Sequence, residues 1–204
     1  MGLSLHYSAK IKSPEDVDLL SAEVAAICRE SGWKFQLWDS LEKVEEPFLP
    51  KEPGQGGDYK GVPLKGIVCT IHEKCEPVFL TFAPSGYTTS FINLKFVDQI
   101  ADINPDLVYT ISVKTQFAGP QIHIVLVNLL RYLGQKYCSE LQVSDEGGFW
   151  ETNDEAVLLS AFQQYDDLLN MVAATLQSIP LDQDDTPEGL ARKIQAMLSA
   201  IGRK

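Results

Sequence analysis

Apolar and polar residues follow a pattern that occurs twice along the chain, over residues 5–40 and 108–146. In each copy an alternating segment, typical of a β-strand, leads to a proline and then to an apolar-rich segment of about twenty residues with helical spacing. A second short alternating segment follows. Each copy therefore predicts a strand, a helix and a strand.

The two copies also share residues at equivalent positions. Ser8-Ala9-Lys10 matches Ser112-Val113-Lys114 at an offset of 104 residues. After a two-residue insertion, an offset of 106 residues pairs Pro14 with Pro120, Gln36 with Gln142 and Asp39 with Asp145. We interpret the pattern as an internal duplication.

Local signals mark the helix in each copy. In the first, Ser13, Pro14 and Asp16 predict a capped start, and Gly32 predicts the end. One apolar stripe is expected to face the sheet: Val17, Leu20, Val24 and Ile27. In the second copy the stripe is His123, Leu126, Leu130 and Leu133, on a helix that is apolar nearly all round and hence covered on more than one side.

The remaining segments add strands and helices. Residues 66–72 and 77–82 predict a hairpin around Glu73-Lys74, and residues 88–96 predict a further strand. A Thr152 and Glu155 capping box predicts a helix to about residue 178, and Thr186-Pro187 predicts a shorter last helix. The proline- and glycine-rich loop 46–63 is either a mobile flap or a spacer.

Together these elements predict one α+β domain over residues 1–204. Duplicated strand-helix-strand units with added hairpins would form a mixed β-sheet, with the helices largely on one face. Residues 153–204 would form a C-terminal helical segment of two helices.

Composition narrows the classes of partner. The 204 residues carry a formal net charge of −11, which disfavours a nucleic-acid backbone or an anionic membrane as partner. No apolar run is long enough to span a bilayer, and the start of the chain does not resemble a signal peptide. Four scattered cysteines suit reduced thiols, so we expect a cytoplasmic protein.

Residues 143–152, VSDEGGFWET, are the first candidate site. A two-residue Gly147-Gly148 turn would make a hairpin in which Asp145 faces Trp150 on the inward side, with Glu151 on the outward side. Asp145 would then be a desolvated acid suited to proton transfer or to binding a cation. The alternative is a turn aspartate that accepts backbone hydrogen bonds.

His123 is the second candidate. It lies on the sheet-facing stripe in the first turn of its helix, and Lys114 and Thr115 end the strand before it. The lysine, the imidazole and the free helix amides could therefore hold an anion. The alternative is a core histidine bonded to a backbone carbonyl. By the repeat, Asp39 corresponds to Asp145, and we add Asp39 and its neighbour Trp38 to the ligand-binding candidates.

No metal or cofactor is predicted. Cys69, His72 and Cys75 have the form C-x-x-H-x-x-C, but a fourth zinc ligand is missing and Cys69 alternates with apolar strand residues. The sequence contains no phosphate-binding glycine loop, no dinucleotide fingerprint, no H-E-x-x-H and no G-x-S-x-G.

The stretch SVKTQFAGPQIHIVLVNLLRYL, with LQVSDEGGFWETND after it, resembles a family of uncharacterised bacterial proteins. The resemblance covers residues 112–154 and implies no activity, cofactor or site residue.

Two main hypotheses follow. The first is a non-enzymatic protein that binds a small molecule or a protein near Asp145, Trp150 and the cleft between the repeats. The second is a small hydrolase or isomerase that uses Asp145 or Glu151 with His123 as acid and base, and Lys114 to hold an anion. Self-association into a homodimer through the long helix after residue 152 is a third possibility.

Overall fold

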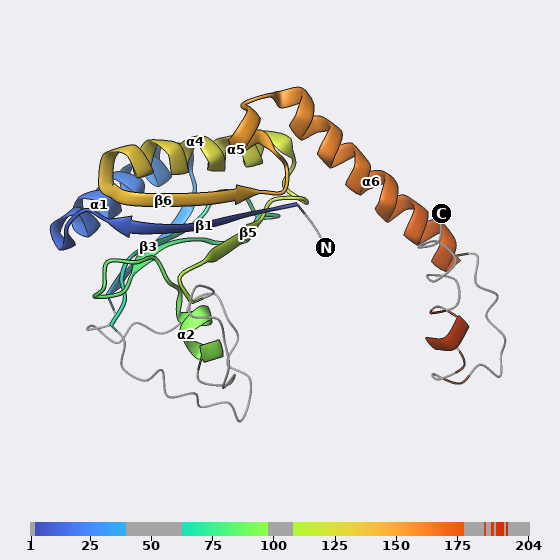
Figure 1. Cartoon of the computed structure of the whole chain (residues 1–204), viewed down its shortest axis with the longest axis horizontal. Helices are drawn as coiled ribbons and strands as arrows, with labels where there is room; N and C mark the ends of the chain where they lie inside the picture. The colour runs from blue at the N-terminus through green and yellow to red at the C-terminus, as the bar shows by residue number, and fades with distance from the viewer. Residues whose placement is uncertain are drawn as a thin grey trace.

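The computed structural model describes residues 3–39, 63–97 and 108–177, with residues 186, 189, 191–193 and 195. Its strands are β1 Ser4–Ile11, β2 Lys34–Asp39, β3 Lys65–Thr70, β4 Val78–Phe82, β5 Ile111–Lys114 and β6 Cys138–Asp145. Its helices are α1 Pro14–Ser31, α2 Phe91–Val97, α4 Pro120–Tyr137, α5 Phe149–Thr152 and α6 Glu155–Gln177. The predicted α+β class is confirmed (Figure 1). Apart from Pro63, loop 46–63 lies outside the described residues.

Both predicted strand-helix-strand units are present. α1 and α4 each begin at the predicted proline and each contain 18 residues. Gly32 ends α1 in the left-handed conformation, with φ of 70°. The Ser13 hydroxyl, however, donates to the Asp16 carboxylate at 2.9 Å and does not cap a helix amide.

The strand pairing differs from the expected mixed sheet. Among the described residues, all paired strands are antiparallel, in two three-stranded sheets with the orders β5-β1-β6 and β2-β3-β4. The reason is that the strands of one unit do not pair with each other. β5 and β6 lie on either side of β1, whereas β2 pairs with β3.

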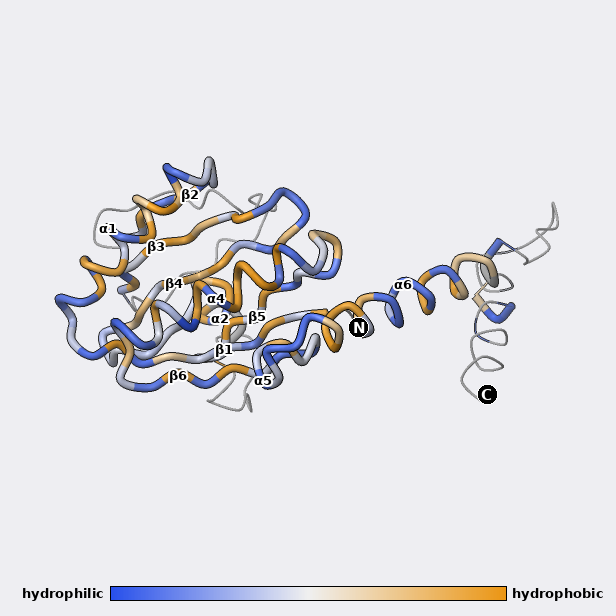
Figure 2. Tube along the Cα trace, turned by 90° about the horizontal axis from the view of Figure 1, so that it is seen from above, coloured by the Kyte–Doolittle hydropathy of each residue, from blue (hydrophilic) through white to orange (hydrophobic). Residues whose placement is uncertain are grey.

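Residues 86–88 connect the two sheets. The Thr88 amide donates to the Ala9 carbonyl at 2.8 Å, and the Ile11 amide donates to the Gly86 carbonyl at 2.9 Å. Thr88 also bridges to Phe82 at the end of β4. Seen from above, β2, β3, β4, β1 and β6 follow one another in this order across the molecule (Figure 2).

α1 and α4 cover the same face of this strand layer, and α2 lies on the other face (Figure 1). On the α2 side the ring of Phe91 stacks on Trp38 at 5.1 Å and meets Phe79 edge-on at 5.5 Å. One cluster of buried apolar side chains includes residues of both sheets, α1, α4 and the start of α6. The predicted stripes of α1 and α4 are buried, with Ile27 partly so.

Two local predictions are wrong. Residues 149–152 are the short helix α5 and not the return strand of a hairpin, because the carboxylate of Asp145 binds the amide of Trp150 and turns the chain. Residues 91–97 form helix α2 where a strand was expected, with the Ser90 hydroxyl accepting the Asn93 amide at its start.

α6 starts through a different cap from the one predicted. Asp154 Oδ1 accepts the Ala156 amide at 2.8 Å, whereas the Thr152 hydroxyl donates to the Gly148 carbonyl. Between α5 and α6, Asn153 adopts a positive φ of 53°. α6 then runs away from the sheets, and its far end lies clear of them (Figure 1).

Candidate functional site

His123 and Asp145 meet beneath the start of α6. His123 lies in the first turn of α4 and faces the sheet, as its place on the apolar stripe predicted. Asp145 ends β6 opposite Leu5, on the inward face of the strand. The imidazole Nε2 lies 3.0 Å from Asp145 Oδ1, and both side chains have no exposed surface.

Thr115, which follows β5, completes a buried chain of three groups. Its hydroxyl lies 2.7 Å from Nδ1 of His123, and Thr115 is fully buried. At Nε2 the contact with Asp145 has the length of a hydrogen bond but a poorer angle, so we describe it as a short polar contact. Asp145 favours the proton on Nε2, which leaves Nδ1 to accept the hydroxyl proton of Thr115.

The carboxylate of Asp145 also organises the chain after β6. Its Oδ1 accepts the Gly147 amide at 2.6 Å, and its Oδ2 accepts the Trp150 amide at 2.8 Å. Burial alone would raise the pKa of this carboxyl. The contact with His123 and the two amides outweigh burial and hold the pKa below its ordinary value. The turn-aspartate alternative therefore describes Asp145, with His123 as an additional partner.

The order hydroxyl, imidazole, carboxylate is the order of a catalytic triad, but a triad must reach a substrate. Here the Thr115 hydroxyl lies beneath the surface, 3.4 Å from the Leu3 carbonyl. Leu158 and Phe162 of α6 are buried over the site, and the ring of Phe162 meets the imidazole edge-on at 6.1 Å. In this arrangement the three groups stabilise the fold.

Lys114 does not join this group. Lys114 pairs with Ser4 on β1, on the opposite face of the sheet from Leu5 and Asp145, because side chains alternate along a strand. The backbone amide of Lys114 donates to the Glu76 carboxylate at 2.8 Å. The predicted anion site of Lys114 with His123 is therefore not formed.

Trp150 and Glu151 belong to α5 and not to a strand. Trp150 is half-buried, and the Arg131 guanidinium lies 5.3 Å from the centre of its ring. Arg131 also donates to the carbonyl of Trp150 at 2.8 Å and to Oδ1 of Asn153 at 2.6 Å. Glu151 is exposed. Through these contacts, Arg131 and Trp150 hold α5 against α4.

Asp39 and Trp38 point to different faces of β2. Trp38 is buried against Phe91 on the α2 side, and its indole nitrogen has no hydrogen-bond partner within the described residues. Asp39 is half-buried and pairs with Lys65 across β2 and β3. Asp39 also lines a pocket at the start of α1, which none of the other candidate residues lines.

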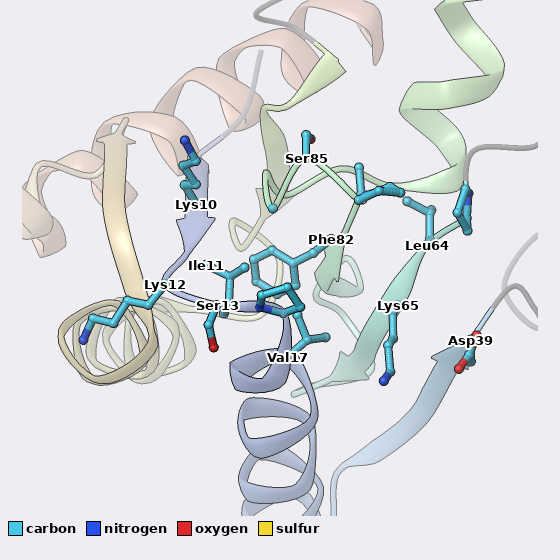
Figure 3. Close-up of a pocket in the computed structure, with 15 residues that line it drawn as sticks. Lys10, Ile11, Lys12, Ser13, Val17, Asp39, Leu64, Lys65, Phe82 and Ser85 are labelled. Atoms are coloured by element: carbon cyan, nitrogen blue, oxygen red, sulfur yellow. The ribbon is translucent and has the colours of Figure 1, made fainter.

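This pocket lies at the start of α1, where β1 and β4 end and β3 begins. Its volume is about 360 Å³, and most of its wall is apolar. The apolar wall includes Ile11, Pro14, Val17, Leu64, Phe82 and Ala83. Figure 3 shows Ile11, Val17 and Phe82 gathered at its centre, with Ser85 and Asp39 at its margins.

Three lysines surround the pocket, but their ammonium groups have other partners. Lys12 Nζ donates to the carbonyls at the end of α4, and Lys65 Nζ forms an ion pair with Asp18 at 2.7 Å. Lys10 Nζ lies 4.9 Å from the centre of the Tyr87 ring. The pocket therefore presents the lysine alkyl chains more than their charges (Figure 3).

Two hollows of larger volume flank the root of α6. The hollow beside Asp145, Gly147 and Gln164 has a volume of about 550 Å³, and the hollow beside Gln116 and Gln163 about 470 Å³. Both are more open to solvent than the pocket at α1. We regard the pocket at α1 as the stronger ligand site because it is more enclosed and more apolar.

The described residues contain no cluster of three or more histidine, cysteine or acidic side chains placed to hold a metal ion. Cys69 is buried in β3, and Nδ1 of His72 accepts the Lys74 amide. Within the same part of the chain, no helix is both long and apolar enough to cross a bilayer. Comparisons with protein-family models, curated proteins and solved structures give no match, so the functional argument rests on the site geometry.

Sequence reasoning placed Thr115 near His123 but gave it no role, and it did not identify Arg131 or the pocket. Thr115 and His123 are eight residues apart in the sequence. Their contact could have been inferred from a polar residue at the end of a strand and a histidine on the sheet-facing stripe of the next helix. For Arg131 the signal was a cation on an otherwise apolar helix. The pocket brings together residues 10–17, 63–65 and 82–86, and no local pattern predicts this combination.

Proposed function

We propose that this chain is a non-enzymatic, cytoplasmic binding protein whose ligand occupies the pocket at the start of α1. The observation that supports the proposal most is the contrast between the two sites. The titratable groups His123 and Asp145 have no exposed surface, whereas an apolar pocket of about 360 Å³ is open to solvent. All four cysteines are free thiols, which favours a reducing compartment.

The pocket favours a small ligand with an apolar body. Its volume is near the lower end of the range of about 300–1,000 Å³ found for ligand pockets. Apolar contact would supply most of the affinity, since the lysine charges are directed to Asp18, to carbonyls of α4 and to Tyr87. Ser85 and Asp39 at the margin would fix the polar end of the ligand.

The enzyme hypothesis receives one supporting observation, the contact of His123 with Asp145 and Thr115. Among the described residues, α6 covers His123 and Thr115, and although Asp145 lines the hollow beside Gly147, its carboxylate has no exposed surface. Of its other proposed members, Lys114 lies on the opposite face of the sheet, and Glu151 is exposed on α5. We therefore propose binding and not catalysis.

The proposal is tested with Nile red, an uncharged apolar dye whose fluorescence rises in an apolar site. We expect saturable binding of one dye per chain. Val17→Phe adds a ring to the pocket wall and should weaken dye binding by about tenfold or more, equivalent to losing a few buried methylene contacts.

Val125→Phe provides the matched control. Val125 is 36% exposed on α4 and lies outside the pocket wall, so the same substitution there should leave dye affinity unchanged. Circular dichroism of both variants verifies that they fold. Equal affinity of Val17→Phe and the parent chain, or dye uptake without saturation, would contradict the proposal.

A further inference from the structure

Two exposed apolar side chains line the hollow beside Gln116 and Gln163, which we call the Gln116 hollow. Phe117 is 61% exposed and Leu159 is 51% exposed. Phe117 belongs to the turn between β5 and α4, and Leu159 to the second turn of α6. Large apolar side chains that gather at one exposed site are typical of a surface that binds another molecule.

The turn between β5 and α4 holds Phe117 at the surface. The carbonyl of the buried Thr115 accepts the Ala118 amide at 2.9 Å. The backbone amide of Gln116 donates to the Leu3 carbonyl at 3.3 Å. These bonds fix the backbone on both sides of Phe117, so binding at its ring would need little additional ordering of the chain.

Gln116 adds a buried polar group to the same hollow. It is only 8% exposed, and its side-chain amide forms no hydrogen bond with the described residues. A glutamine amide has two donor hydrogens and an acceptor oxygen. A peptide group can satisfy both functions when its backbone is extended, whereas in a helix the backbone groups are already paired. Gln116 therefore favours an extended peptide segment as the partner.

The charge of the hollow indicates a basic segment. Asp166 is the only charged residue among the described residues that line it. Asp166 is exposed and forms no ion pair within the described part of the chain. Between residues 155 and 177 the sequence has three acidic residues and no lysine or arginine. A lysine or arginine of the bound segment would therefore be complementary to Asp166.

We propose that the Gln116 hollow binds an extended segment of a partner protein in which a lysine or arginine lies close to a large apolar residue. The apolar side chain packs on Phe117 and Leu159, and the cation pairs with Asp166. The hollow of about 470 Å³ is more open than the pocket at α1, which suits a segment that lies across it. No residue lines both sites, so the hollow is separate from the pocket.

Selection of a random heptapeptide library, displayed on phage, against the full chain tests the proposal. We expect the enriched heptapeptides to carry lysine or arginine within two positions of a large apolar residue. The dissociation constant of an enriched peptide, measured by fluorescence anisotropy, should rise at least about tenfold in Leu159→Ser, because apolar contact is lost.

Leu19→Ser is the matched control for the apolar contact. Leu19 is 58% exposed on α1 and lies outside the hollow, so this variant should bind the peptide with unchanged affinity. An equal loss of affinity in Leu19→Ser and Leu159→Ser would contradict the proposal, because the peptide would then not depend on the hollow.

Gln116→Met separates binding from stability. Methionine keeps the size of the side chain but removes the unpaired amide, so the melting temperature should stay the same or rise. Peptide affinity should fall about fivefold, which corresponds to the loss of one hydrogen bond. A lower melting temperature with unchanged affinity would assign Gln116 to the fold and overturn its role in binding.

A charge reversal tests the role of Asp166. Asp166→Lys should bind an enriched peptide less tightly and prefer the analogue in which glutamate replaces the basic residue, less so at high salt. Glu30→Lys is the control: it changes the net charge equally, but Glu30 is exposed on α1 outside the hollow. This control should keep the basic preference, and the same reversal in both variants would overturn the proposal.

Three further results would overturn the proposal. One is a selection in which the parent chain enriches no peptide beyond those enriched by Leu159→Ser. Another is a set of enriched peptides without basic residues. The third is a parent dimer in light scattering that dissociates in Leu159→Ser, which would identify a second copy as the occupant. Nile red binding at α1 is unaffected by these results, so they are independent of the proposed function.

Discussion

At the scale of single residues, the buried carboxylate of Asp145 makes three polar contacts with other parts of the chain. Each oxygen of its carboxylate accepts a backbone amide, and one oxygen also lies against Nε2 of His123. With no exposed surface, the carboxylate cannot replace any of these partners by water. The side chain therefore couples the end of β6 to both α4 and α5.

We expect Asp145→Asn to lower the free energy of unfolding by about 3 kcal/mol, because the amide keeps the shape but removes a buried charge and an acceptor. Urea denaturation measures the change. Glu140→Gln, on the exposed face of the same strand, is the control and should change stability by less than about 0.5 kcal/mol. An equally small loss in Asp145→Asn would assign Asp145 to binding and not to structure.

Part of this environment was predictable from the sequence. Glycines at 147 and 148 indicated a turn, and an aspartate before them is a common acceptor of turn amides. The inward direction of Asp145 followed from alternation with Val143 and Leu141. The partnership with His123 was not predictable, because it depends on where α4 crosses β6. The assumed hairpin instead placed Trp150 opposite Asp145.

At the scale of elements, α6 is attached to the body through a small, close-packed root. A Cβ added at Gly147 would lie 2.6 Å from Leu158 Cδ1, 3.1 Å from Asp145 Oδ1 and 3.2 Å from His123 Cε1. Any side chain at this position must displace the start of α6. Glycine is thus required here by the close approach of three side chains.

Gly147→Ala should loosen α6 without unfolding the sheets. We expect a loss of about 1–3 kcal/mol from overpacking and faster hydrogen exchange at the amides of Leu158 and Phe162. Gly32→Ala is the comparison, since a Cβ there meets nothing within 4 Å and the cost comes only from its positive φ. Unchanged exchange in the first turns of α6 of Gly147→Ala would show that the root tolerates the methyl group.

Among the elements, α1 and α4 could be predicted well and α2 and α5 could not. Proline at the first helical position and apolar stripes over about five turns are strong local signals for α1 and α4. α5 has four residues, and its geometry is determined by Arg131 and Asp145 from other elements. The sequence of α2 is rich in β-forming residues and alternates between apolar and polar positions, which predicted a strand. The contacts of Phe91 with Trp38 and Phe79 favour the helix instead.

At the scale of the whole molecule, one carboxylate joins the helices of the two repeats. Glu23 of α1 accepts hydrogen bonds from Lys136 Nζ at 2.8 and 2.9 Å and from the hydroxyls of Tyr132 and Tyr137 at 2.5 Å, all on α4. These donors lower the pKa of Glu23 from 4.5 to about 2. The depressed pKa makes this connection sensitive to acid.

Because the folded-state pKa is the lower one, Glu23 contributes stability that is present above pH 4.5 and is lost as the pH falls toward 2. Asp145, whose pKa is also lowered, acts in the same direction. We expect the denaturation midpoint of the parent chain to fall more steeply between pH 5 and 2.5 than that of Glu23→Gln. A stability difference between the two chains that is equal at pH 6 and pH 3 would contradict this assignment.

The order of the strands is the part of the fold that the sequence did not indicate. Each strand-helix-strand unit suggests that its own two strands lie in one sheet, and the repeat suggests two equivalent units. Instead β1 pairs with both strands of the other unit, and β2 pairs with β3. Pairings between segments more than 100 residues apart have no local signal.

The central position of β1 has a consequence for how the protein is made. β1 is encoded at residues 4–11, but its neighbours β5 and β6 end at residues 114 and 145. A ribosome needs on the order of ten seconds to synthesise the intervening chain. During this interval both edges of β1 lack their partners, so the sheet β5-β1-β6 can form only after most of the described chain has been synthesised.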